Sequence, residues 1–81
     1  MKYIATFYSH FGAIRFKKEI ENVCGEATLM PVPRFLSSSC GTCCAFTAED
    51  VPTPSHPDEV EQIVSFGEND ERQVVYSTLD D

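Results

Sequence analysis

The N-terminal third of the chain contains the pattern that most limits its fold: two strand-like runs separated by a helical stretch with clear ends. Residues 2–8, KYIATFY, mix β-branched and aromatic side chains without strict alternation, which is typical of a strand covered on both faces. Ser9 can cap a helix over residues 10–24, and Gly25 ends it where a positive φ is usual. Residues 27–32, ATLMPV, follow as a second strand. This order predicts a right-handed crossover that leaves the two strands parallel.

The helical stretch carries its apolar side chains at spacings of three and four residues, which predicts one broad buried face. The charged side chains fall largely on the opposite side. The residues expected on the buried face are Phe11, Ala13, Ile14, Phe16, Ile20 and Val23.

Three more elements are predicted in the second half of the chain. Residues 43–48, CCAFTA, read as a strand, and residues 72–79, RQVVYSTL, read as the last strand. Between them, a proline-rich connection leads to Ser55, which can cap a short helix that Gly67 closes before a polar turn. The apolar stripe of this second helix would consist of Val60, Ile63 and Val64.

The predicted order, β-α-β-β-α-β, favours an α+β fold. We expect a ferredoxin-like two-layer sandwich in which a four-stranded antiparallel sheet is covered on one face by two helices. The alternative is a three-stranded sheet whose last strand pairs elsewhere or in a dimer. A chain of 81 residues with 42% hydrophobic content can bury one core, so we expect a single domain over residues 1–81, with 80–81 as a solvated tail.

Charge and hydropathy exclude several classes of function. The chain has six Lys and Arg against 13 Asp and Glu, too few cations for a nucleic-acid binding protein. Residues 1–44 hold five of the cations and three acids, whereas residues 45–81 hold one cation and ten acids, most of which we expect to face solvent. No apolar run is long enough to cross a membrane, and the first ten residues are too short and polar for a signal peptide. We therefore expect a soluble, cytoplasmic protein that needs no membrane.

Three of the four cysteines lie in PVPRFLSSSCGTCC, residues 31–44. In the cytoplasm thiols stay reduced, so clustered cysteines are more often reactive or metal-binding than disulfide-bonded. The predicted crossover would bring the loop with Arg34 and Cys40 to the start of the first helix. The unpaired N–H groups of a helix start and a nearby guanidinium both favour a thiolate, so we expect the pKa of Cys40 to be lowered. The alternatives are that Cys40 is a buried, inert thiol and that Arg34 anchors the loop by bonding carbonyls or a carboxylate.

The neighbours of Cys40 suggest supporting roles. Gly41 would let a second molecule approach the sulfur closely, and Cys43, in C-G-T-C, is the natural resolving partner of a redox pair. Loop serines and the residues at the helix start could bind an anionic group, although serines in loops usually bond their own backbone. The anion-binding candidates are Ser9, His10, Ser38, Ser39 and Gly41.

A metal site is a further alternative, because the four cysteines and one of the two histidines, His10 or His56, could formally supply four ligands. The chain lacks a second closely paired set of ligands, so we expect neither a metal nor another cofactor. Cys24, at the end of a helix, fits the core, and Cys44 would point to the opposite face of its strand from Cys43.

At these residues the sequence resembles the family of small bacterial selenium or sulfur carrier-like proteins. The resembling segments are YIATFYSHFGAIRFKKEI, then MPVPR followed by SSSCG, over roughly residues 3–47. The resemblance implies that the cysteine before glycine, Cys40 here, accepts sulfur or selenium as a persulfide or selenopersulfide and passes it to another protein. This chain departs from the family pattern by adding Cys43 and Cys44.

Two classes of function follow. The first is a sulfur or selenium carrier, a monomer or homodimer that meets a protein donor and a protein acceptor. The second is a binding or regulatory module without chemistry, which docks through the sheet face that the helices leave open. Either is a better fit than a stand-alone enzyme. Some of the aromatic residues must fill the core, and those that could line the open face are among Tyr3, Phe7, Phe46 and Tyr76.

Overall fold

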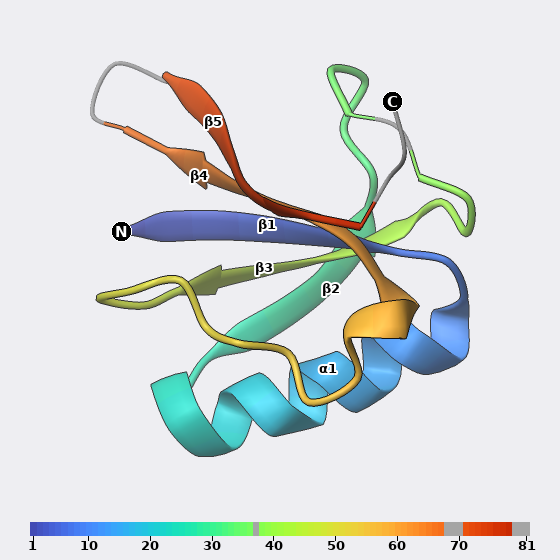
Figure 1. Cartoon of the computed structure of the whole chain (residues 1–81), viewed down its shortest axis with the longest axis horizontal. Coiled ribbons are helices and arrows are strands. Elements are labelled where there is room, and N and C mark those ends of the chain that lie inside the picture. The colour runs from blue at the N-terminus through green and yellow to red at the C-terminus, as the bar shows by residue number, and fades with distance from the viewer. Residues whose placement is uncertain (37, 68–70, 79–81) are drawn as a thin grey trace.

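The computed structural model describes residues 1–36, 38–67 and 71–78, which form one helix, a single 3-10 turn and one sheet. Figure 1 shows these elements along the chain. In chain order they are β1 (Lys2–Phe7), α1 (His10–Cys24), β2 (Ala27–Pro31), β3 (Thr42–Thr47), η1 (Pro57–Glu59), β4 (Val60–Phe66) and β5 (Arg72–Ser77).

The strands of the sheet lie in the order β2-β3-β1-β4-β5, and each neighbouring pair is antiparallel. Because β3 lies between them, β1 and β2 run parallel to each other, as the predicted crossover requires. Strand β1 lies at the centre of the sheet, and five of its six residues are buried. Burial on both faces explains why its sequence lacks a strict alternation of apolar and polar residues. In Figure 1, α1 lies along one side of the sheet, and the loop after β2 projects on the other.

The predicted limits of α1 are confirmed. Ser9 Oγ accepts a hydrogen bond from the Gly12 amide at 3.2 Å, and Gly25 closes the helix with a φ of +91°. The buried face is narrower than predicted. Ala13, Phe16 and Ile20 are buried with Gly12, but the predicted residues Phe11, Ile14 and Val23 are exposed.

The core lies between α1 and the sheet. Phe16 points from the helix into a cluster of rings on β1 and β3, with ring centres 5.2 Å from Phe7 and 5.6 Å from Phe46. Tyr3 stacks on Phe46 at 5.3 Å. The expectation that Tyr3, Phe7 and Phe46 line an open face is therefore wrong, because alternate residues of β1 and β3 direct these rings toward the helix. Tyr76 also packs against this core.

The prediction of a second helix is wrong. Residues 57–59 form a 3-10 turn, and Val60–Phe66 form strand β4, which pairs with β1 on one side and β5 on the other. The apolar spacing that suggests a helix arises because β4 is buried on both faces, so Val60 and Ile63 join the core while Val64 lies on the opposite face.

The fold is therefore an α+β fold with one helix and a five-stranded antiparallel sheet. The four strands, two helices and ferredoxin-like order that the sequence suggests are not found. The polar turn after Gly67 and the tail at 80–81 lie wholly or mostly outside the described residues. Within the described ranges, no helix combines the length and apolar character needed to span a membrane.

The sheet face opposite α1 is partly covered by the loop after β2. The ring of Phe35 in this loop lies edge-on to Phe66, with ring centres 5.8 Å apart, and the Arg72 guanidinium lies 4.5 Å above the Phe35 ring. Beside this contact is a cleft of about 600 Å³ whose floor includes Ile4 and Met30.

Candidate functional site

The loop that joins β2 to β3 is fixed to the end of β1 and the start of α1. Ser38 Oγ donates to the carbonyl oxygen of Phe7 at 2.9 Å, and Thr42 Oγ1 lies 3.0 Å from His10 Nδ1. The Val32 amide donates to the Gly41 carbonyl at 3.1 Å, which closes the base of the loop. These contacts place the segment around Cys40 at the N-terminal end of α1, as expected from two parallel strands joined by a helix.

Cys40 is half-buried and its sulfur contacts polar atoms. Its Sγ donates to the Thr42 carbonyl oxygen at 3.3 Å and lies 3.9 Å from Ser38 Oγ, while the side chain also packs against the core. Gly41 follows with a φ of +74°, and a Cβ at this position would meet no atom within 4 Å apart from those of its chain neighbours. The structure leaves open space around the Cα of Gly41. The role predicted for Gly41 in the approach to the sulfur stays a prediction.

The two cysteines after Gly41 differ sharply from Cys40. Cys43 and Cys44 are both buried on the strand β3, and they point to opposite faces because they are adjacent. Burial, and secondarily the Cys40 thiol, raise the pKa of Cys43, whose Sγ lies 3.7 Å from the Pro31 carbonyl oxygen. Burial raises the pKa of Cys44 to about 12, with a smaller contribution from Cys43. Neither thiol ionises readily at neutral pH.

Cys24 is the other half-buried cysteine, and it lies at the opposite end of the helix. It is the last residue of α1 and lines a cleft of about 610 Å³ together with Glu49 and Asp50.

A buried carboxylate in β4 binds the loop that carries Cys40. Glu61, in β4, is only 4% exposed. Its two oxygens accept the Ser39 amide at 3.2 and 3.3 Å, and Oε2 accepts the Ser39 hydroxyl at 2.7 Å. Sequence reasoning misses this residue because the acidic half of the chain is expected to face solvent. Had this segment, VEQIVSF, been predicted as a strand, a carboxylate among its apolar residues would have stood out as a candidate buried charge.

The structure does not bring every predicted residue to the sulfur. The Ser9 hydroxyl caps α1, and Ser39 is bound by Glu61. Arg34 is exposed in the turn closed by the Leu36 amide and the Pro33 carbonyl, and it makes no hydrogen bond or ion pair with a described residue. The roles predicted for Arg34 and His10 therefore stay predictions. Residue 37 lies outside the described residues.

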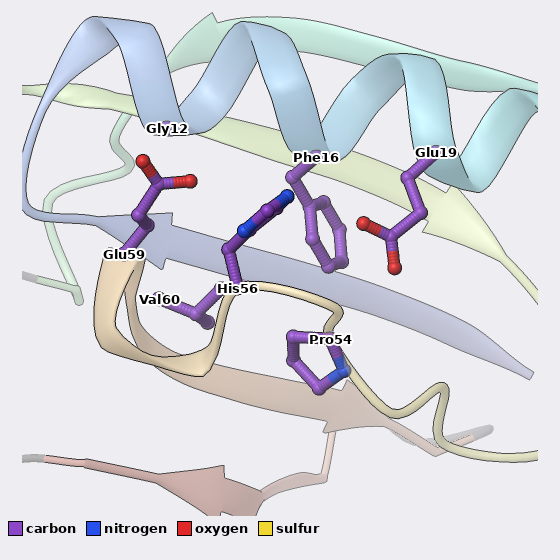
Figure 2. A pocket seen from close by; sticks show the side chains of 7 residues that line it. All are labelled: Gly12, Phe16, Glu19, Pro54, His56, Glu59 and Val60. Carbon is purple, nitrogen blue, oxygen red and sulfur yellow. The ribbon is translucent and has the colours of Figure 1, made fainter.

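The segment before β4 packs against the helix and leaves little space. Figure 2 shows His56 and Glu59 approaching α1 opposite Gly12 and Phe16. The Arg15 guanidinium pairs with Glu59 at 2.9 Å, and a Cβ on Gly12 would lie 3.1 Å from Glu59 Cβ. The cavity here holds about 10 Å³, room for one water at most, so His56 belongs to a packing contact.

Metal ligands do not gather in the described part of the chain: no three His, Cys, Asp or Glu residues lie close enough together to hold a metal ion. The four cysteines therefore do not form the ligand set that their number suggests, since Cys43 and Cys44 point to opposite faces of β3 and Cys24 lies at the far end of the helix.

Comparison with known proteins identifies one family. The model of the family described as "Putative Se/S carrier protein-like" matches residues 2–55, about two thirds of the chain, and this range contains β1, α1, β2, the Cys40 loop and β3. No curated protein and no solved structure gives a significant match. By the extent of the family match, the chain belongs to the Se/S carrier-like family.

Proposed function

We propose that the protein carries sulfur or selenium on Cys40 between a donor protein and an acceptor protein. The observation that carries this proposal is the contrast within the cysteine cluster. Cys40 is half-buried beside an open glycine, whereas Cys43 and Cys44 are buried and have raised pKa values. One thiol of the cluster is thus accessible to a visiting group.

The proposed transfer needs no outside oxidant or reductant. The Cys40 sulfur attacks the terminal sulfur of a donor persulfide, so a new S–S bond forms on Cys40 while the S–S bond of the donor breaks. The donor leaves as a thiol, and the proton that the donor sulfur gains balances the proton that the Cys40 thiol loses. An acceptor thiol then attacks the terminal sulfur on Cys40 in the same way. A selenium atom would follow the same route as a selenopersulfide.

The surroundings of Cys40 suit an anionic terminal sulfur. The loop lies at the N-terminal end of α1, where the helix dipole favours negative charge, and His10 is exposed there. Arg34, exposed on the same loop, has no carboxylate partner among the described residues, so we propose that it attracts the incoming group. The exchange would take place in the cytoplasm, where thiols are kept reduced.

The burial of Cys43 speaks against the redox alternative. A resolving thiol must reach the disulfide or persulfide sulfur as a thiolate, but Cys43 is fully buried with a raised pKa. The proposed carrier reaction uses Cys40 alone.

Intact-mass measurement tests the proposal. The protein is incubated with a cysteine desulfurase and cysteine, and the expected result is a mass gain of one sulfur that Cys40→Ser abolishes. Cys24→Ser, which removes the other half-buried thiol, is the matched control and should load like the wild type. Equal loading of Cys40→Ser and the wild type would refute the assignment.

A second candidate function rests on the cleft opposite α1. This cleft of about 600 Å³ lies between the loop and the β4–β5 hairpin, and Phe35 beside it is 50% exposed. The observation favours docking of a partner protein on this face. If docking rather than thiol chemistry is the function, Phe35→Ser would weaken co-purification of the partner from cells and Cys40→Ser would not.

A further inference from the structure

Glu61 is a buried carboxylate that the proposed transfer does not itself use. A charged side chain that is 4% exposed is costly unless its oxygens are satisfied. No Lys or Arg among the described residues pairs with it, whereas the nearby Glu59 pairs with Arg15. Within the described part of the chain, its hydrogen-bond donors come from one residue, Ser39, whose amide and hydroxyl both point to the carboxylate.

Ser39 directly precedes Cys40, so whatever fixes Ser39 also fixes the backbone that carries the reactive sulfur. The hydroxyl bond to Glu61 is short, at 2.7 Å, and it is assisted by charge. Such bonds are about twice as strong as those between neutral groups. The next residue back, Ser38, bonds only the Phe7 carbonyl at 2.9 Å and the Cys40 sulfur at 3.9 Å. The Glu61 carboxylate is therefore the strongest described attachment of this segment to the sheet.

The backbone of β4 is held independently of this carboxylate. Thr78 donates its amide to the Glu61 carbonyl oxygen at 3.0 Å and its hydroxyl to the Val60 carbonyl oxygen at 2.6 Å, and β4 pairs with strands on both sides. Loss of the carboxylate charge should therefore free the loop more than it disturbs the sheet.

We propose that Glu61 is the positioning residue for Cys40, acting through Ser39. The carboxylate sets the direction of the Ser39–Cys40 backbone, and with it the position of the sulfur near the start of α1. This role deepens the carrier function proposed above and rests on it. The anchoring itself is independent of any sulfur donor and can be measured without one.

The chain offers a matched pair of variants for the test. Glu61→Gln keeps the size and shape of the side chain but removes its charge and one acceptor. Glu59→Gln makes the same chemical change two residues earlier, at a carboxylate that bonds Arg15 on α1. Ser39→Ala removes the 2.7 Å hydroxyl bond and leaves the amide bonds, so it gives a milder version of the same change.

Two measurements on the full chain report the anchoring. Amide hydrogen exchange follows the Ser39 N–H, and peptide mass spectrometry gives the iodoacetamide alkylation rate of Cys40 against pH. A charge-assisted hydrogen bond contributes about 1.5 to 3 kcal/mol, so we expect Glu61→Gln to speed exchange at Ser39 by about tenfold or more. Alkylation of Cys40 should also be faster, because a loosened loop exposes the half-buried thiol more often. Cys24 should be unchanged.

Sulfur loading completes the test. We expect Glu61→Gln to load more slowly from the desulfurase although its Cys40 is more reactive toward iodoacetamide, because transfer between proteins needs a fixed direction of approach. Glu59→Gln should match the wild type in all three measurements. If the wild type takes up no sulfur, the carrier function fails while exchange and alkylation still decide the anchoring.

Unchanged exchange at Ser39 and unchanged Cys40 alkylation in Glu61→Gln would overturn the proposal. An equal response in Glu59→Gln would also overturn it, because the effect would then be a general loosening of this segment. If Glu61→Gln does not fold, Ser39→Ala decides. Faster Cys40 alkylation in that variant supports the role, and a wild-type rate rejects it.

Discussion

Two half-buried cysteines lie at opposite ends of the α1 helix and differ in almost everything except exposure. Cys40 lies at the helix N-terminal end, in a loop that is hydrogen-bonded to β1, α1 and β4. Cys24 is the last helical residue and lines a cleft with Glu49 and Asp50. The first end carries the partial positive charge of the helix dipole, and the second end carries the partial negative charge. Accessibility alone therefore does not define the site, because direction, charge and anchoring separate the two thiols.

The largest predicted effect concerns the buried thiols that follow Cys40. With a pKa of about 12, roughly one Cys44 in ten thousand is ionised at pH 8, and burial blocks the reagent as well. We expect iodoacetamide to label Cys40 and Cys24 in the native protein while Cys43 and Cys44 remain unlabelled. Because the pKa of Cys44 is raised, its labelling should begin only as the pH rises toward 12. Peptide mass spectrometry measures all four rates, and labelling of Cys44 at pH 8 as fast as Cys40 would contradict the assignment.

The next largest effect is expected when either of two buried aromatic side chains of the core is replaced by alanine. Phe7→Ala and Phe46→Ala should each lower the free energy of unfolding by about 3 to 5 kcal/mol, because each ring is almost fully buried. Urea unfolding measures the loss. Only Phe7→Ala should also speed Cys40 alkylation, because loss of the ring lets the end of β1 shift, and the Phe7 carbonyl oxygen there accepts the Ser38 hydroxyl. Equal effects of the two variants on Cys40 would show that the loop responds to general stability alone.

A glycine pair sharpens the comparison further. Gly41, beside Cys40, and Gly25, beside Cys24, have φ values of +74° and +91°, and a methyl group added at either position would meet no atom within 4 Å apart from those of the chain neighbours. Alanine at either site should therefore cost about 1 to 3 kcal/mol through backbone strain alone. Thermal unfolding measures this cost.

The two alanine variants should differ in the thiol that responds. Gly41→Ala should slow the reaction of Cys40 with a protein donor, because a methyl group narrows the approach to the sulfur. Gly25→Ala should leave Cys40 unchanged. A wild-type loading rate for Gly41→Ala would show that this glycine serves the turn and not the approach.

The smallest effect is expected for an ion pair on α1, between the two ends of the helix. Lys17 and Glu21 form an exposed i, i+4 ion pair at 3.1 Å on α1. Lys17→Ala should lower the free energy of unfolding by no more than about 0.5 kcal/mol and should change neither Cys40 nor Cys24 labelling. A measurable change at Cys40 would mean that charges along the whole helix, and not the loop alone, control its reactivity.

Local signals explain which elements could be predicted from the sequence. Ser9 and Gly25 carry chemistry that is specific to helix ends, so α1 and the flanking strands could be placed to within a residue. The segment around Val60 has no such end signal. A strand buried on both faces can show the same apolar spacing as a helix, and its pairing with β1 depends on residues more than 50 positions away.

The candidate site also has one part that the sequence can predict and one part that it cannot. The approach of the Cys40 loop to the start of α1 follows from two parallel strands joined by a helix, which sequence can predict. The anchoring by Glu61 cannot be predicted in that way, because it joins Ser39 to a strand whose apolar spacing indicates a helix.

The most direct test of the carrier role is to locate the transferred atom. After incubation with a cysteine desulfurase and cysteine, the protein is trapped with iodoacetamide and digested, and each cysteine peptide is examined for one added sulfur. The account predicts the added sulfur on Cys40, with Cys24, Cys43 and Cys44 unmodified. An added sulfur on Cys24, or none on Cys40 while the desulfurase is active on a known acceptor, would contradict it.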